Sequence, residues 1–376
     1  MRPLIVGLGR SGAGLHLKAL TTLHTLHTRH GAARDGARRD GAARDGAPGD
    51  GAPRDGAPPL TWPPLACDPR PEAARGLTGV TVTTSLKAAA SLTEPRDTVV
   101  HLCTPPSTRT GVLTELAELG FTRVLVEKPL AGDVDQLDAV VRLREAHGLD
   151  LTVVAHWLAA GLTRQLRHLV AGRRLGTLLA IDVVQHKPRF SRTLATHGHP
   201  TAFDVEVPHA LGVVLDLAGP AELVTAHCGD MVCDSTVVPR MGSAALTLRH
   251  QNGVRTEIVS DLTSPVRQRS FTLRFTQGTA TAHYPVSDRD DHAQLILTGA
   301  VEAHRTFRDD ALAAFLHDTY RRFAQGRVAD FALHHTVARL LCEAKSRCHG
   351  DDGHARTTAA PRTTAAHPPR KDAHAG

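Results

Sequence analysis

The sequence has few aromatic residues, no long apolar run and no closely spaced pair of cysteines. Aromatic side chains make up 3% of its 376 residues, so leucine, valine and alanine must build its cores. No run is apolar for long enough to cross a bilayer, and no charged leader opens the chain, so we expect a cytoplasmic protein with no membrane partner. The six cysteines include no C-x-x-C pair, which leaves a zinc ribbon or a redox dithiol without support.

Basic residues outnumber acidic ones, but they are not gathered in one segment. The net charge is +6 and comes from arginine rather than lysine. No basic patch interleaved with aromatic residues occurs, so we expect no nucleic-acid partner. Because lysine is rare in this chain, a lysine in a cleft is more informative than usual. The length and the 41% of hydrophobic residues suffice for two domains.

The N-terminal stretch has the pattern of a dinucleotide-binding turn. A strand over 3–6 precedes the motif GLGRSG at 7–12, and a helix is expected over 13–26. The glycines allow a tight turn and a close backbone approach, and the start of the helix offers free N–H groups to a pyrophosphate. We therefore predict a cofactor site formed by Gly7, Gly9, Arg10, Ser11 and Gly12.

Residues 31–59 repeat a five-residue theme, GAARD or a close variant, that contains no residue able to anchor a core. We interpret this segment as a disordered insertion without function. When it is left out, a strand over 65–68 ends in Asp68, at the place where an acidic residue bonds the ribose 2′-hydroxyl. Asp68 therefore favours NAD. Arg70, two residues later, could instead bind a 2′-phosphate, so NADP stays possible.

Apolar strands alternate with helices up to residue 155. Further strands are expected over 80–83, 98–103, 124–126 and 151–155, and helices over 85–91, 110–119 and 133–147. This alternation is typical of a parallel sheet with helices on both faces. We predict an α/β protein whose N-terminal Rossmann domain, residues 1–155, binds the dinucleotide.

The second half predicts a different sheet. Strand-like runs occur at 178–186, 222–228, 244–249, 255–260, 271–275, 279–284 and 294–298, and helices are expected at 309–325 and 330–348. Short turns such as Asn252-Gly253 join the runs, which is typical of antiparallel pairing. We predict a C-terminal α/β domain over 156–349 with an open, mainly antiparallel sheet that serves substrate binding and oligomerisation. A disordered tail over 350–376 should follow.

Two stretches carry candidate catalytic residues. The strand over 124–126 ends in Glu127-Lys128-Pro129, at the sheet edge where α/β proteins bind ligands, and the bond before the proline can be cis. Farther on, Glu206 and His209 lie three residues apart ahead of an apolar helix, which places both on one face if Asp204 caps that helix. A histidine beside a carboxylate is a plausible general base.

Other polar side chains near these stretches have more than one interpretation. His156 and Trp157 follow the last strand of the first domain, so we place them at the substrate cleft. The basic run of Lys187, Arg189 and Arg192 either lies in a solvated loop, which we favour, or contacts a phosphate or nucleotide on the substrate. Histidine and carboxylate are ordinary zinc ligands, but the chemistry expected here needs no metal, so we predict none. The weaker alternative is a metal cluster of His197, His199, His209 and Asp204.

Four segments together resemble the Gfo/Idh/MocA family of NAD(P)-dependent oxidoreductases. They are GLGRSG at 7–12, CTPPSTR at 103–109, GFTRVLVEKPL at 120–130 and AGRRLGTLLAI at 171–181. The resemblance implies a Rossmann domain joined to an open antiparallel sheet, often in dimers or tetramers. It also implies that Lys128 hydrogen-bonds the reacting oxygen and that Glu127 supports the cofactor. Thr104 and Pro105 would line the nicotinamide side.

The chain departs from the family at two positions. Arg109 stands where the family usually has histidine after the TPP turn. Val205 stands where the family has an aspartate four residues before the histidine, so that role passes to Glu206, which we favour, or to Asp204.

The resemblance implies hydride transfer between a nicotinamide cofactor and a hydroxyl or keto carbon of a cyclitol or sugar. In that reaction His209 would take the hydroxyl proton and Lys128 would stabilise the alkoxide. The arginine-rich, lysine-poor composition suggests an actinobacterial-type genome, and for such a genome the resemblance implies a role in aminocyclitol or deoxysugar antibiotic biosynthesis. One alternative is an NADPH-dependent ketoreductase of a nucleotide-linked sugar, with Arg70 and the run from Lys187 to Arg192 on its phosphates. Another is a non-catalytic dinucleotide sensor on the same fold.

Overall fold

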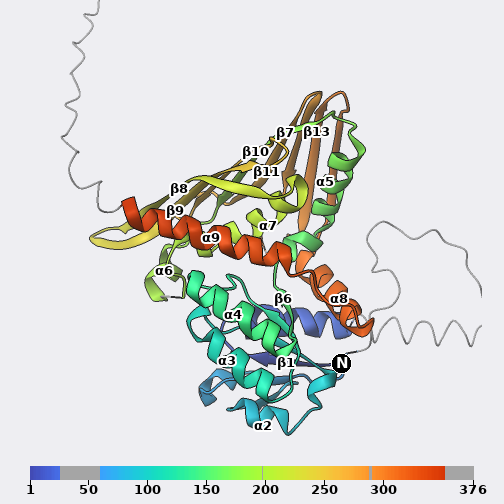
Figure 1. Ribbon diagram of the computed structural model, residues 1–376, viewed down its shortest axis with the longest axis vertical. Helices are drawn as coiled ribbons and strands as arrows, with labels where there is room; N and C mark the ends of the chain where they lie inside the picture. The colour runs from blue at the N-terminus through green and yellow to red at the C-terminus, as the bar shows by residue number, and fades with distance from the viewer. Residues whose placement is uncertain (26–59, 197, 288–289, 352–376) are drawn as a thin grey trace, which may run out of the picture.

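The computed structural model describes residues 1–25, 60–196, 198–287 and 290–351, which form two sheets with their helices (Figure 1). The repeat at 31–59, His197 and nearly all of the C-terminal tail lie outside these ranges. None of the described helices is both long and apolar enough to span a membrane.

The first sheet is parallel and has six strands. They are β1 (Arg2–Val6), β2 (Leu65–Cys67), β3 (Thr81–Thr83), β4 (Thr98–Leu102), β5 (Arg123–Val126) and β6 (Asp150–Val153). Their order is β3-β2-β1-β4-β5-β6, so strands are added on one side of β1 up to β3 and on its other side from β4 onward. The carboxyl ends of these two strands therefore flank the crevice in which such sheets bind ligands. The predicted Rossmann topology is confirmed.

The helices of this half lie near the predicted positions. They are the π-helical turn η1 (Gly12–Leu17), which continues as α-helix to residue 25, the short η2 (Pro71–Ala74), α2 (Leu86–Ala90), η3 (Pro95–Asp97), α3 (Pro106–Glu118) and α4 (Val134–His147). Helix α3 begins four residues earlier than predicted, at Pro106. Proline is well suited to the first turn because its missing N–H would have no helical partner there.

The second sheet has eight strands and is mainly antiparallel, as predicted. They are β7 (Leu178–His186), β8 (Ala221–Cys233), β9 (Thr236–His250), β10 (Arg255–Asp261), β11 (Gln268–Phe275), β12 (Gly278–His283), β13 (His292–Gly299) and β14 (Ala303–Arg308). Their order is β14-β13-β12-β11-β7-β10-β9-β8, and β7 runs parallel only to β10. Strand β14 and the outer part of the β8–β9 hairpin were not predicted.

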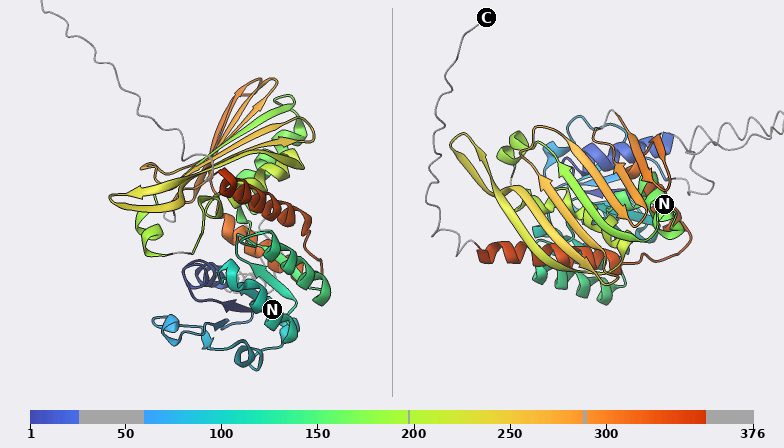
Figure 2. Two further views of the ribbon diagram at one scale, coloured as in Figure 1. Left: turned by 60° about the vertical axis from the view of Figure 1, so that its left-hand side comes forward. Right: turned by 90° about the horizontal axis from the view of Figure 1, so that it is seen from above.

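Helices cover one face of this sheet, and seen from above the other face carries none of the described helices (Figure 2). The helical segments in the second half of the chain, not all of which lie on this face, are η4 (His156–Ala159), α5 (Gly161–Gly172), α6 (Phe190–Ala195), η5 (Ala202–Asp204), α7 (Val207–Ala218), α8 (Ala311–Ala324) and α9 (Ala332–Asp351). Of these, α5 and α6 were not predicted. Helix α7 is buried almost throughout, which fixes the residues at its start.

Helix α8 returns to the first sheet although it belongs to the last part of the chain. Its Phe315 and Tyr320 pack in one apolar cluster with Ile5 of β1 and Leu8 of the glycine turn. The dinucleotide-binding half therefore takes part of its core from residues beyond 300, which a division of the sequence at residue 155 does not anticipate.

Candidate active site

The glycine turn has the shape that a dinucleotide requires. Gly7 has a φ of +91°, and a Cβ at Gly12 would lie 1.9 Å from the carbonyl oxygen of Gly7, so a side chain fits at neither position. At Gly9 a Cβ would meet nothing within 4 Å, so the backbone there is open to a ligand. These residues fit the pyrophosphate of a dinucleotide, which would lie against Gly9 and the start of η1.

Asp68 lies just beyond the end of β2 and is buried. Its carboxylate accepts hydrogen bonds from the N–H of Leu8 at 2.8 Å and from Arg70 Nε and Nη2 at 3.0 Å each. Burial would raise the pKa of Asp68, but the hydrogen bonds from Arg70 and Leu8 lower it. The carboxylate is therefore ionised beside the glycine turn. The Arg70 side chain is 61% exposed, so it is able to swing away from a ribose hydroxyl or toward a phosphate.

Glu127 is held by groups from the glycine turn and from η1. Ser11 Oγ donates to Glu127 Oε1 at 2.5 Å, and His16 Nε2 lies 3.0 Å from the same oxygen. Burial would raise the pKa of Glu127, but His16, then Lys128 and Ser11, lower it to about 2. Glu127 therefore connects the end of β5 to the cofactor turn through Ser11.

A chain of buried side chains continues from Glu127 to α8. His16 Nδ1 lies 2.7 Å from His101 Nδ1, and His101 Nε2 lies 2.8 Å from the Tyr320 hydroxyl. Burial would lower the pKa of His16, but Cys103 and then Glu127 raise it to about 10, whereas burial and the charge of His16 lower the pKa of His101 well below its usual value. His16 is thus an imidazolium that donates to both Glu127 and a neutral His101.

Replacing His16 by leucine should lower the free energy of unfolding by about 3 kcal/mol at pH 6, because the buried Glu127 loses its hydrogen-bonded cation and keeps only the charge of Lys128. A raised histidine pKa stabilises the fold fully below about pH 6.5, and this contribution is lost as the pH rises toward 10. Urea denaturation from pH 6 to pH 10 should show the difference between wild type and variant shrinking, while the exposed His304→Ala changes little. A difference that stays constant would mean that His16 is neutral.

The Lys128 side chain reaches from the first sheet to the start of α7. The Lys128-Pro129 peptide bond is cis, and Lys128 Nζ donates to the carbonyl oxygens of Asp204 at 3.2 Å and Val205 at 2.8 Å. Burial lowers the pKa of Lys128, and the charge of Glu127 opposes that shift. An ammonium has three donors, so two carbonyl partners leave one N–H for a ligand.

Arg109 joins two turns at the site, a role that the sequence did not reveal. Its side chain is 1% exposed and donates to the carbonyl oxygens of Pro129 and Leu130 and, at 2.8 Å, of Thr104. The turn that carries Thr104 and Pro105 is thereby fixed to the turn that follows Lys128. Thr104 Oγ1 is buried and has no hydrogen-bond partner among the described residues.

His209 lies in the first turn of α7 without a carboxylate partner. Its ring lies 5.5 Å from that of Trp157 and 4.4 Å from that of His156, and its Nδ1 has no hydrogen-bond partner among the described residues. Burial, followed by the charges of His156 and Lys128, lowers the pKa of His209 well below its usual value. His209 and Lys128 also line one cavity of about 20 Å³, enough for a water molecule.

The two carboxylates expected beside His209 bind other groups. Glu206 pairs with Lys187 Nζ and, at 3.2 Å, with Arg269 Nε, and these cations lower its pKa to about 2 against the effect of burial. The Asp204 carboxylate accepts from Thr201 and from Lys345 Nζ at 3.0 Å. The expected pairing of His209 with either carboxylate is therefore not formed.

The local argument failed at the start of α7. Glu206 and His209 were placed on one face on the condition that Asp204 caps this helix, but Asp204 belongs to η5, and Glu206 occupies the N-cap position of α7 without a side-chain cap bond. Spacing along a helix does not report the cations that reach Glu206 from Lys187, just after β7, and from Arg269 of β11. Lys187 belongs to the basic run that we favoured as a solvated loop, with a phosphate contact as the alternative, but its side chain is 23% exposed and bound to Glu206.

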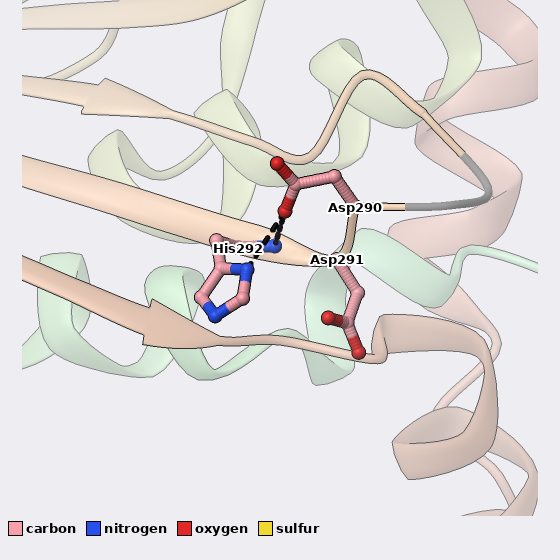
Figure 3. Close-up of side chains that lie close together, drawn as sticks. All are labelled: Asp290, Asp291 and His292. Atoms are coloured by element: carbon pink, nitrogen blue, oxygen red, sulfur yellow. Dashed lines mark hydrogen bonds and ion pairs between the residues drawn. The ribbon is translucent and has the colours of Figure 1, made fainter.

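The prediction that no metal is bound is not tested by the structure. The described residues do include one group of three side chains whose possible metal-ligand atoms lie close together. Asp290, Asp291 and His292 lie at the start of β13 (Figure 3). His292 Nδ1 lies 2.7 Å from Asp290 Oδ1, and Arg308 pairs with Asp291 at 3.1 Å. These contacts explain the cluster without an ion. Of the metal cluster weighed from the sequence, His197 lies outside the described residues, and Asp204 is bound by Lys345 and Thr201.

Comparison with known proteins gives a family for part of the chain. Residues 65–155 match the family model GFO_IDH_MocA, described as an oxidoreductase family with an NAD-binding Rossmann fold. These residues belong to the Gfo/Idh/MocA oxidoreductases. The resemblance seen in the motifs is thereby confirmed, as is the prediction of an NAD(P)-binding oxidoreductase. No curated protein matches the chain.

Solved structures of the Gfo/Idh/MocA type share the fold along almost the whole chain. A levoglucosan dehydrogenase, solved with NADH and levoglucosan, is 16% identical with a TM-score of 0.68, covering 93% of this chain and 98% of its own. A 3-ketoreductase from Actinomadura kijaniata, solved with NADP and TDP-benzene, is 14% identical with a TM-score of 0.69 and coverages of 93% and 97%. The WlbA dehydrogenase from Bordetella pertussis, solved with NADH and UDP-GlcNAcA, is 18% identical with a TM-score of 0.67 and coverages of 93% and 96%.

Proposed function

We propose that this protein transfers a hydride between a nicotinamide cofactor and a hydroxyl or keto carbon of a sugar or cyclitol. The observation that carries the proposal is that Lys128 and His209 line one cavity, and that Glu127, the residue before Lys128, is bonded to Ser11 of the glycine turn. Lys128 has one free N–H, and the unpartnered Nδ1 of His209 belongs to a neutral ring. A cation and a neutral base facing one ligand suit a hydroxyl that must lose its proton.

The nicotinamide, when bound, supplies the hydride acceptor or donor. In the oxidative direction Nδ1 of His209 takes the proton of the substrate hydroxyl. The free N–H of Lys128 binds the same oxygen and stabilises the negative charge that develops on it. His156 and Trp157 pack against the His209 ring and fix its orientation. Glu206 does not act on His209 in this mechanism; it holds Lys187 and Arg269 in place through its two ion pairs.

A sugar or cyclitol is the substrate class that we propose. Buried polar atoms without partners among the described residues occur on Thr104 and Gln185, and on His156 and His209, whose rings lie 4.4 Å apart. Hydroxyl groups are suited to satisfy such atoms. The neighbouring structures named above contain a sugar or nucleotide-linked ligands, in agreement with this chemistry. A place in antibiotic biosynthesis rests on composition alone.

We also propose a cytoplasmic homodimer or homotetramer that uses the bare face of the second sheet. The family that the chain resembles covers such faces by oligomerisation. Sedimentation velocity measures the assembly directly, and a monomer at micromolar concentration would contradict it.

A screen of inositols, aminocyclitols and sugars with NAD and NADP tests the activity itself. We expect turnover with at least one polyol, and at least tenfold tighter binding of NAD than of NADP, or about 1.4 kcal/mol, because Asp68 repels a 2′-phosphate. Tighter binding of NADP would show that Arg70 determines the choice. Dinucleotide binding without turnover of any polyol or nucleotide-linked sugar would favour a sensor.

A further inference from the structure

Arg189, just before α6, is a buried cation whose side chain has no partner among the described residues. Its side chain is 6% exposed, and its backbone N–H bonds the carbonyl oxygen of Leu262 at 2.9 Å, which fixes its place beside β10. Its Nε is buried without a hydrogen-bond partner, and no described residue accepts from its guanidinium. A buried charge without a partner is destabilising, so such a group is expected where a ligand completes it.

Further unpartnered polar atoms lie near Arg189. Thr193 follows it by one helical turn, is 3% exposed, and has an Oγ1 without a partner among the described residues. The Nδ1 of His199 is likewise buried without a partner, and burial and then the charges of Lys128 and Arg189 lower the pKa of His199 to about 2. A charged donor and two neutral polar groups without partners thus lie in one segment, 189–199, and His199 is close enough to Arg189 and Lys128 for their charges to act on it.

The positive charge around Arg189 is not balanced by a free carboxylate in the contacts described below. Burial, followed by Arg192 of α6 and Arg10 of the glycine turn, lowers the pKa of Arg189 to about 10, so three guanidinium groups from both halves of the molecule act on one another. Glu206 is the acidic side chain that opposes this shift, but Lys187 and Arg269 already occupy its two oxygens. Figure 1 shows α6 extending from the second sheet toward the first half of the molecule.

We propose that Arg189, together with Thr193, Arg192 and Arg10, binds the pyrophosphate group of a ligand in the cleft. A pyrophosphate offers several oxygens and two or more negative charges, which matches planar guanidinium donors better than a single carboxylate does. Two sources carry this group, the dinucleotide itself and a nucleoside-diphosphate-linked substrate. The proposal rests on the proposed function, since both ligands belong to that reaction.

Calorimetric titration of Arg189→Gln separates the two sources without any turnover. Binding of NADH is measured first, and binding of inorganic pyrophosphate to the NADH-saturated protein second. Loss of a charged hydrogen-bonding group should weaken the affected ligand by about 10–100-fold. Weaker NADH binding assigns the site to the cofactor. Unchanged NADH binding with weaker pyrophosphate binding assigns it to the substrate, and weakening of both also supports the site.

Two further variants keep the test decisive. Arg189→Lys retains the charge and should restore part of the affinity. Arg339→Gln, on the exposed side of α9 where Arg339 pairs with Glu343 at 3.8 Å, should change neither titration. The proposal is wrong if Arg189→Gln melts like the wild type, binds NADH within twofold of it, and shows no loss of pyrophosphate binding. Pyrophosphate that binds equally to both proteins, or to neither, counts as no loss. The hydride-transfer proposal would survive that result, because it depends on Lys128 and His209.

Discussion

Lys128→Met should lower turnover by about 10²–10³ while NADH affinity changes little. Lys128 donates to the carbonyl oxygens of Asp204 and Val205, which aim its remaining N–H at the ligand. Methionine keeps most of the aliphatic length but removes the charge and all three donors. The lost interaction is stronger with the alkoxide-like transition state than with the hydroxyl, so the loss appears in kcat more than in KM.

The pH profile gives this prediction a second measurement. Burial lowers the pKa of Lys128 from its usual value, so the ammonium is lost on the alkaline side below pH 10.5. Wild-type turnover should fall there, and Lys128→Met should lack that limb. Lys87→Met, on the exposed surface of α2, is the matched control. Near-normal turnover of Lys128→Met on an identified substrate would refute the mechanism.

The parts of the site that depend on neighbouring residues were predictable from the sequence. The glycine turn, Asp68 at the end of β2 and Lys128 at the end of β5 each follow an apolar strand directly. Parallel strands joined by helices bring their carboxyl ends to one edge, so strand, turn and helix suffice to place these residues together.

Contacts between distant segments were not predictable. Arg109 hydrogen-bonds the carbonyl oxygen of Pro129, 20 residues later in the chain. The presence of arginine where the family usually has histidine did not indicate this contact. Glu206 was assigned to His209 from helical spacing, but Lys187, just after β7, and Arg269 of β11 bind it instead. Close packing decides which cation meets which carboxylate, and periodicity within one element carries no such information.

The chain from Glu127 to Tyr320 shows the same limit over a longer range. His16, His101 and Tyr320 come from η1, β4 and α8, and no motif links them. The helical pattern of α8 was clear from the sequence, but its return to the first sheet was not. A raised histidine count was the one available signal, and in a chain with 24 histidines it does not single out His16.

His209→Ala should lower oxidative turnover by about 10²–10⁴. His209 is neutral because burial and the charges of His156 and Lys128 hold its pKa well below 6.5, so it is ready to accept a proton throughout the neutral range. As the pH falls through that low pKa the ring becomes protonated and the base is lost. Wild-type turnover should therefore be level at neutral pH and fall only below about pH 6.5, because the usual pKa of a histidine side chain is the upper bound for that of His209.

The shape of the profile separates this role from simple packing against Trp157. His209→Ala should lose the acid limb and keep the alkaline limb that belongs to Lys128, whereas Lys128→Met should show the reverse. If both groups act on one substrate oxygen, the double variant should lose much less activity than the product of the two single losses. The exposed His304→Ala should retain wild-type turnover and both limbs. An acid limb that persists unchanged in His209→Ala would show that another group takes the proton.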